Sequence, residues 1–257
     1  MRRGEIVIAF AALMALLGAA VGSFVALVAE RLVRGDRIAL ARSTCRSCGT
    51  VLRARDLVPV FSFLALRGRC AACNARIPPL LFQAEILGAA FGIAAAYSAP
   101  DPLRALLLAT WLWALLGLAL ADLRYFRLPD GLTLAAAVLG LALALAGDGS
   151  GWPPLADRAV HAMIGAVAGG GSFWLIRVGY RWQTGRDGMG WGDVKLMAAL
   201  GLAMGLERLP IMVLLAALSA LLMALLRAWR KGRPLNRLGR VPFGAALAMA
   251  AAVIALI

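Results

Sequence analysis

Eight apolar stretches, separated by short charged or Pro/Gly-containing segments, recur along the whole chain. Hydrophobic residues make up 62% of the chain and charged residues 16%, whereas a soluble domain is about 45–50% apolar and about 25% charged. A soluble core of this size cannot bury so large an apolar excess, so lipid must be the solvent for most of the chain. We therefore predict an all-α, polytopic membrane helix bundle, and exclude a disordered chain, a disulfide-rich secreted module and an ordinary cytosolic enzyme.

The predicted spans are Ile6–Ala29, Leu80–Ala99, Leu103–Ala121, Leu132–Ala146, Val160–Val178, Trp191–Leu206, Pro210–Leu226 and Val241–Ile257. The fourth and the sixth are shorter than the roughly 17 residues that usually cross a bilayer. With the N-terminus outside and eight crossings, most of the 27 Lys and Arg residues lie in cytoplasmic loops, as the positive-inside rule requires. Omitting either short span would export the basic cluster Arg227–Arg240. We therefore predict eight spans, with both termini outside.

The formal net charge of +14 would suggest a nucleic-acid partner in a soluble protein. The positive-inside rule explains it here, so we expect lipid and no nucleic acid as a partner. The first span resembles a signal peptide, but its apolar run continues through Val28, and we expect it to be retained. The predicted domains are a first transmembrane helix (1–29), a small cytoplasmic domain (30–79) and a transmembrane bundle (80–257).

All four cysteines of the chain lie in the predicted cytoplasmic domain, as the pairs Cys45/Cys48 and Cys70/Cys73. Two-residue gaps let paired thiolates bind one tetrahedral ion at about 2.3 Å. The residues that follow the pairs, Gly49 and Asn74, suit tight turns. Disulfides are the alternative, but the predicted orientation places this segment in the reducing cytosol. We predict one structural zinc ion per chain, because four cysteines leave no open position for water.

Acidic residues gather at the predicted cytoplasmic membrane edge, namely Asp122, Asp130, Asp187 and Asp193. An acid within a span costs about 2.5–3.5 kcal/mol at its centre, so such residues are functional candidates. Gly190 and Gly192 before Asp193 allow close backbone approach, although an ordinary N-cap aspartate explains this local pattern equally well. Asp122 and Asp193, from different helices, could share a proton around a water, with one acting as general acid and the other as general base.

These motifs together resemble the type IV prepilin peptidase family of GxGD aspartic proteases. Gly22-Ser23-Phe24 resembles its first-helix motif, and the cysteine pairs, with Pro59, Arg67-Gly68-Arg69 and Glu85, resemble its zinc-binding loop. The segments Asp122–Asp130 and Gly188–Leu196 resemble its two aspartate motifs. The resemblance implies that Asp122 and Asp193 are catalytic. We expect Gly190, Gly192, Lys195, Asp130 and Asp187 to support them.

The resemblance also implies a reaction. Family members remove the basic leader of type IV prepilins and type II secretion pseudopilins, cutting after a Gly at the cytoplasmic face of the bacterial inner membrane. Full-length members then methylate the new N-terminus with S-adenosylmethionine. This chain departs from the family pattern at Ala26 (usually Asn), Leu81-Phe82 (usually Tyr-Pro) and Asp187 (commonly Glu). The first two departures lie in or beside the region linked to methyl transfer.

Two other classes of protein stay open on the sequence alone. One is a non-enzymatic zinc-ribbon membrane adaptor or a proton-coupled transporter, although no inverted repeat is visible and the acids lie at the membrane edge rather than at its midplane. The other is a presenilin-type protease, which cuts within membrane helices. The sequence predicts no S-adenosylmethionine-binding residues, no particular pilin and no oligomeric state.

Overall fold

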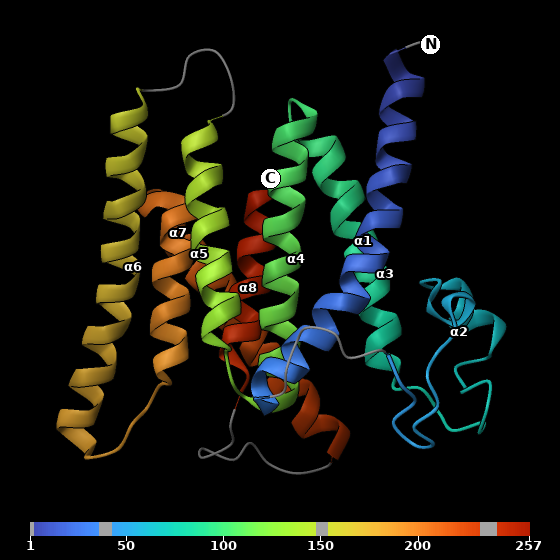
Figure 1. Cartoon of the computed structure of the whole chain (residues 1–257). Coiled ribbons are helices and arrows are strands. Elements are labelled where there is room, and N and C mark those ends of the chain that lie inside the picture. The colour runs from blue at the N-terminus through green and yellow to red at the C-terminus, as the bar shows by residue number, and fades with distance from the viewer. Residues whose placement is uncertain (1–2, 36–42, 148–153, 232–240) are drawn as a thin grey trace. The chain divides into compact units, whose positions relative to one another are not determined.

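The structure is a computed structural model that describes residues 3–35, 43–147, 154–231 and 241–257 (Figure 1). Its elements in chain order are α1 (Arg3–Arg34), η1 (Ala54–Leu57), α2 (Phe61–Ala65), α3 (Pro79–Ser98), α4 (Pro102–Tyr125), α5 (Asp130–Ala146), α6 (Leu155–Thr184), α7 (Trp191–Lys231) and α8 (Phe243–Ala255). Within these ranges the only β structure is two isolated bridges. The predicted all-α class is therefore confirmed. Residues 36–42 of the predicted cytoplasmic domain and 232–240 of the predicted basic cluster lie outside the description.

Five of the described helices, α1, α3, α4, α6 and α7, are long and apolar enough to cross a membrane. The helices α5 and α8 are shorter but also apolar. Each of the eight predicted spans overlaps a described helix. The sixth and the seventh predicted spans both lie in α7. Gly205, with φ 65° and ψ 177°, interrupts α7 where the sixth and seventh predicted spans adjoin.

The chain divides into two compact units, Met1–Gly117 and Leu118–Ile257, and α4 runs through the boundary. In the first unit α1 packs against α3 (Figure 1). A Cβ atom on Gly18 of α1 would collide with the backbone of Gly88 in α3, and one on Gly22 would collide with that of Ala84. Small residues four apart are typical of membrane helices whose backbones touch. Glycine spacing therefore sets how closely α1 and α3 approach.

In the second unit α6, α5 and α8 all pack against α7. Glycines also allow close backbone contact between α6 and α7, as they do between α1 and α3. A Cβ atom on Gly165 of α6 would collide with the backbone of Gly201 and Gly205 in α7. Because lipid offers no hydrophobic gain for burying Leu against Leu, such close backbone contact is what holds membrane helices together.

Helix α1 continues to Arg34, beyond the predicted end of the first span at Ala29. Just before its last turn lies Glu30, which is only 6% exposed and forms an ion pair with Arg34, at 2.8 Å, and another with Arg46. The pairing of residues four apart extends the helix past the apolar run.

Candidate active site and metal centre

The two cysteine pairs form two copies of one turn. In the first copy, the Cys45 N–H donates to the carbonyl of Thr50 at 2.9 Å. In the second, the Cys70 N–H donates to the carbonyl of Ala75 at the same distance. An isolated antiparallel bridge flanks each turn. The two cysteine pairs, which have the same spacing, therefore form turns with the same backbone hydrogen bond.

The residue after each pair adopts a left-handed conformation, with φ 71° at Gly49 and φ 58° at Asn74. Their N–H groups donate to the carbonyls of Cys45, at 2.9 Å, and Cys70, at 3.0 Å. Glycine and asparagine are the residues that adopt this conformation most readily. The prediction that these two residues suit tight turns is confirmed.

The four cysteine sulfur atoms lie within 4.8 Å of one another, and the Cys45 and Cys73 sulfurs are 3.8 Å apart. A tetrahedral site with metal–sulfur bonds of about 2.3 Å has sulfur–sulfur edges of about 3.8 Å. Backbone N–H groups of Ser47 and Ala72 donate to the Cys45 and Cys70 sulfurs at 3.5 and 3.4 Å. The cluster has the size and the ligand chemistry to hold one thiophilic metal ion.

Hydrogen bonds lower the thiol pKa at three of the four positions. Backbone N–H groups, that of Cys48 foremost for Cys45 and that of Cys73 foremost for Cys70, lower the pKa of both thiols. Hydrogen bonding to Thr50 lowers the pKa of Cys48. At Cys73 the Ala75 N–H favours the thiolate, but the neighbouring sulfurs and burial outweigh it and raise the pKa to about 12. A bound cation would relieve this crowding, because it compensates the fourth negative charge.

The cysteine segment contacts two membrane helices of its unit, α1 and α3. Besides the Glu30–Arg46 ion pair from α1, Glu85 of α3 accepts a hydrogen bond from the Val60 N–H at 2.7 Å. The rings of Phe63 and Phe82 stack with centroids 4.5 Å apart.

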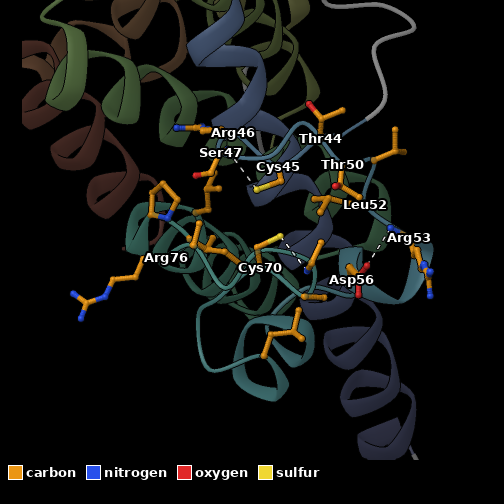
Figure 2. Close-up of a pocket in the computed structure, with 18 of the residues that line it drawn as sticks. Thr44, Cys45, Arg46, Ser47, Thr50, Leu52, Arg53, Asp56, Cys70 and Arg76 are labelled. Atoms are coloured by element: carbon orange, nitrogen blue, oxygen red, sulfur yellow. Dashed lines mark hydrogen bonds between the residues drawn. The ribbon is translucent and has the colours of Figure 1, made fainter.

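A cavity of about 520 Å³ lies beside the two turns (Figure 2). Its apolar wall includes Leu52, Leu66 and Leu81, and its polar wall includes Asp56 and Arg76. Small-molecule sites have volumes of about 300–1,000 Å³ and combine an apolar lining with a few polar groups. The cavity therefore has the size and composition of a small-molecule site.

Asp122 lies in the last turn of α4 and is 6% exposed. Its Oδ2 accepts a hydrogen bond from the Ala245 N–H at 2.8 Å, and the Gly244 N–H is a second donor. Both donors belong to the first turn of α8, where N–H groups have no partner within the helix. The sequence did not predict this contribution of α8. The signal available was Pro242-Phe243-Gly244, a proline-started helix with an early glycine.

Asp193 lies in the first turn of α7, and the Gly190 N–H donates to its carboxylate. A Cβ atom on Gly244 would lie 3.1 Å from Asp193 Oδ1, so Gly244 adjoins both aspartates. The two carboxylates are close enough to interact electrostatically. The structure thus brings together the two acids that the sequence analysis paired.

Leu128, from the loop between α4 and α5, packs over two glycines of this site. Its side chain would lie 3.1 Å from a Cβ atom on Gly192 and 2.8 Å from one on Gly244. The close approach expected of Gly192 is therefore made to Leu128. The absence of side chains at both glycines leaves room for Leu128 next to Asp193.

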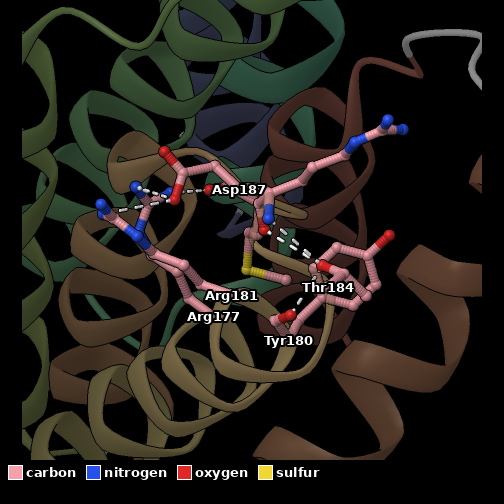
Figure 3. Close-up of polar contacts among 7 residues, drawn as sticks. Arg177, Tyr180, Arg181, Thr184 and Asp187 are labelled. Atoms are coloured by element: carbon pink, nitrogen blue, oxygen red, sulfur yellow. Dashed lines mark hydrogen bonds and ion pairs between the residues drawn. The ribbon is translucent and has the colours of Figure 1, made fainter.

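The other predicted supporting residues form ion pairs. Lys195 Nζ lies 2.8 Å from Asp130 Oδ1 and joins α7 to α5, with both side chains at least half exposed. Asp187 Oδ1 lies 3.0 Å from Arg177 and 3.7 Å from Arg181, both on α6 (Figure 3). Arg177 is only 7% exposed, although the positive-inside rule treats it like any other cytoplasmic arginine.

Comparison with known proteins gives two family matches. The bacterial peptidase A24 N-terminal domain matches residues 16–99, and the type IV leader peptidase family matches residues 106–225. No solved structure gives a significant match.

Similar relatives carry the name prepilin leader peptidase/N-methyltransferase. That of Dichelobacter nodosus is 36% identical, covering 81% of this chain and 68% of the relative. That of Pseudomonas putida is 37% identical, covering 83% and 71%, and that of Aeromonas hydrophila is 39% identical, covering 81% and 69%. With this identity over most of both chains, and with both family matches, the chain belongs to the type IV leader peptidase family.

Proposed function

We propose that this protein is a membrane aspartic endopeptidase that removes the basic leader of type IV prepilins and type II secretion pseudopilins at the cytoplasmic face of the inner membrane. The single observation that carries the proposal is the convergence of Asp122 and Asp193 on Gly244 in a member of this family. A proton-coupled transporter would also place acids in a membrane bundle, so the acids alone do not separate a transporter from a peptidase. The family membership does not favour a transporter or a non-enzymatic adaptor.

In this mechanism the two carboxylates hold one water between them. One carboxylate takes a proton from the water while the water oxygen attacks the scissile carbonyl. The other carboxyl group donates a proton to the departing amine. The protonation states belong to the pair rather than to either residue. The N–H groups of Gly244 and Ala245 fix Asp122 in place while the proton moves.

The proposed orientation places both termini outside and the cysteine segment in the cytoplasm. The basic leader then stays on the cytoplasmic side, and the substrate's apolar helix enters the lipid beside the bundle. The proposed domains are the first helix (1–29), the metal-binding domain (30–79) and the peptidase bundle (80–257). A presenilin-type activity would differ in where it cuts, so mapping the cleaved bond separates the two.

We propose zinc as the metal held by Cys45, Cys48, Cys70 and Cys73. Four thiolates form a closed tetrahedral set, typical of structural rather than catalytic zinc. When bound, the ion cross-links the two turns and supplies folding free energy to a segment with a small core.

We also propose that the protein methylates the new N-terminus with S-adenosylmethionine, as the relatives' name implies for them. The cavity beside the cysteine turns is large enough for a molecule of that size. Leu81, one of the departures from the family pattern, is among its lining residues. The mass of the product N-terminus, with and without the donor, tests this second activity separately from cleavage.

The deciding experiment is cleavage of a purified precursor pilin by the reconstituted protein. We expect Asp122→Asn and Asp193→Asn each to lower the cleavage rate by about 10³-fold or more, because each removes one half of the acid–base pair. Asp157→Asn, at an exposed position in the first turn of α6, is the matched control and should cleave normally. Cleavage at the normal rate by either site variant would overturn the proposal.

A further inference from the structure

Arg177 is a buried cation in the second unit, 7% exposed, in the C-terminal half of α6. Arginine is almost never buried without partners, because removing its charge from water costs several kcal/mol. Its surroundings therefore show what the guanidinium group is for.

The guanidinium group contacts three alternate residues of the segment that leads into α7. Nη2 lies 3.0 Å from Asp187 Oδ1, Nη1 donates to the Met189 carbonyl, and the group lies over the Trp191 ring, 5.0 Å from its centroid. One planar group thus holds the beginning, the middle and the end of a five-residue segment.

The middle contact leads directly to Asp193. The carbonyl of Met189 and the N–H of Gly190 belong to the same peptide group, which is planar. Arg177 donates to the carbonyl oxygen of this peptide. The N–H of the same peptide, that of Gly190, donates to the Asp193 carboxylate. The orientation of one peptide plane therefore connects the buried arginine to the aspartate.

We propose that Arg177 is a positioning residue for the peptidase reaction, which fixes the Met189–Gly190 peptide so that its N–H holds Asp193 in the geometry that cleavage requires. This inference rests on the proposed function, in which Asp193 is one of the two catalytic acids.

Lysine cannot replace arginine in this role. Its ammonium group is a point charge without a planar fork, so it cannot stack on Trp191 and also donate to two separate acceptors in one plane. Arg181 is a natural comparison, because it also pairs with Asp187 but at 3.7 Å and with a side chain that is 68% exposed (Figure 3). Of these two arginines, Arg177 is the one that contacts the Met189–Gly190 peptide.

The test is steady-state cleavage of a precursor pilin by Arg177→Lys in reconstituted full-length protein, with Arg181→Lys as the matched control. We expect Arg177→Lys to lower kcat by about 10²-fold, with KM nearly unchanged, because a small displacement of a catalytic group costs this much. The pH profile of kcat should also shift, because Asp193 loses its fixed donor. Arg181→Lys should change kcat by less than about threefold, because an exposed pair contributes little.

A purely structural role gives a different result. Arg177→Lys would then lose activity only in proportion to the protein that fails to fold or insert, and the remaining enzyme would keep the wild-type kcat and pH profile. Either that result or full activity overturns the inference. As a second measurement, methylguanidinium should partly restore cleavage to Arg177→Ala but not to Asp193→Asn, and no restoration would also count against it.

Failure of the inference and failure of the proposed function give different results. If Asp122→Asn and Asp193→Asn cleave normally, the proposed function itself is wrong. If both are inactive while Arg177→Lys keeps the wild-type kcat and pH profile, only the positioning role is wrong.

Discussion

The cysteine cluster and the aspartate pair are assembled in opposite ways. Each half of the cluster closes within one short turn, and the second turn repeats the backbone hydrogen bonds of the first. The aspartate pair depends on contacts across the chain, since Asp122 and its donor Ala245 are 123 positions apart. Local turn chemistry is enough to prepare each half of the first site, whereas the second exists only when α4, α7 and α8 have packed.

The two regions also differ in what balances their negative charge. Four sulfurs close together call for a metal cation. The aspartates instead receive backbone N–H groups, from the first turn of α8 for Asp122 and from Gly190 for Asp193. A metal ion can be removed by a chelator, but helix N–H groups are lost only when the packing is changed.

The largest effect is expected from the double change Cys45→Ser and Cys70→Ser, which removes one ligand from each turn. Wild-type protein should contain about one zinc per chain and the double variant almost none, because structural zinc needs its complete ligand set. Elemental analysis measures the loss, and limited proteolysis should show faster cutting within residues 43–78. Asp122→Asn should keep its zinc. A double variant with a full complement of metal would contradict the four-thiolate site.

The next effect is on the aspartate pair alone. In Gly244→Ala the new Cβ atom would lie 2.8 Å from Leu128 Cδ1 and 3.1 Å from Asp193 Oδ1. We expect precursor cleavage to fall by about 10- to 10²-fold, because small displacements at an active site are costly. Zinc content should not change. Gly131→Ala is the control, since a Cβ atom there has no neighbour within 4 Å, and equal cleavage by both variants would contradict the contact.

The comparison also explains what the sequence could predict. Local signals such as apolar length, spacing or an adjacent glycine mark the apolar helices, the four cysteines, the residues after each cysteine pair and the two aspartates. The first turn of α8 carries only Pro242-Phe243-Gly244, and nothing in that segment indicates that it will meet a residue more than a hundred positions earlier.

Arg177 shows a second reason for incomplete prediction. The positive-inside rule assigns every cytoplasmic arginine the same role, and only packing separates the buried Arg177 from the exposed Arg181 on the same helix. The contacts between crossing helices are hard to predict for the same reason. Glycines four apart are visible in α6 and α7, but the sequence does not show that Gly165 meets Gly201. Residue types are therefore predictable where contacts are not.

A smaller effect tests whether the two cysteine turns are truly equivalent. Gly49 has φ 71°, a conformation that costs a β-branched residue about 1–2 kcal/mol, so Gly49→Val should weaken zinc binding by roughly tenfold in competition with a chelator. Asn74→Gly at the matching position has φ 58° and should bind zinc as the wild type does. Weaker binding by Asn74→Gly than by Gly49→Val would show that the two turns are not interchangeable.

The smallest effect is expected where a long-range contact is exposed. Lys195 and Asp130 join α7 to α5 at 2.8 Å, but their side chains are 51% and 76% exposed. A double-mutant cycle with Lys195→Met and Asp130→Asn should give a coupling free energy of unfolding below about 1 kcal/mol, because water screens such pairs. High salt should reduce it further. A coupling well above that value that does not respond to salt would contradict this expectation. It would mean that an exposed ion pair between helices stabilises the fold without burial, unlike the pair that the buried Arg177 forms.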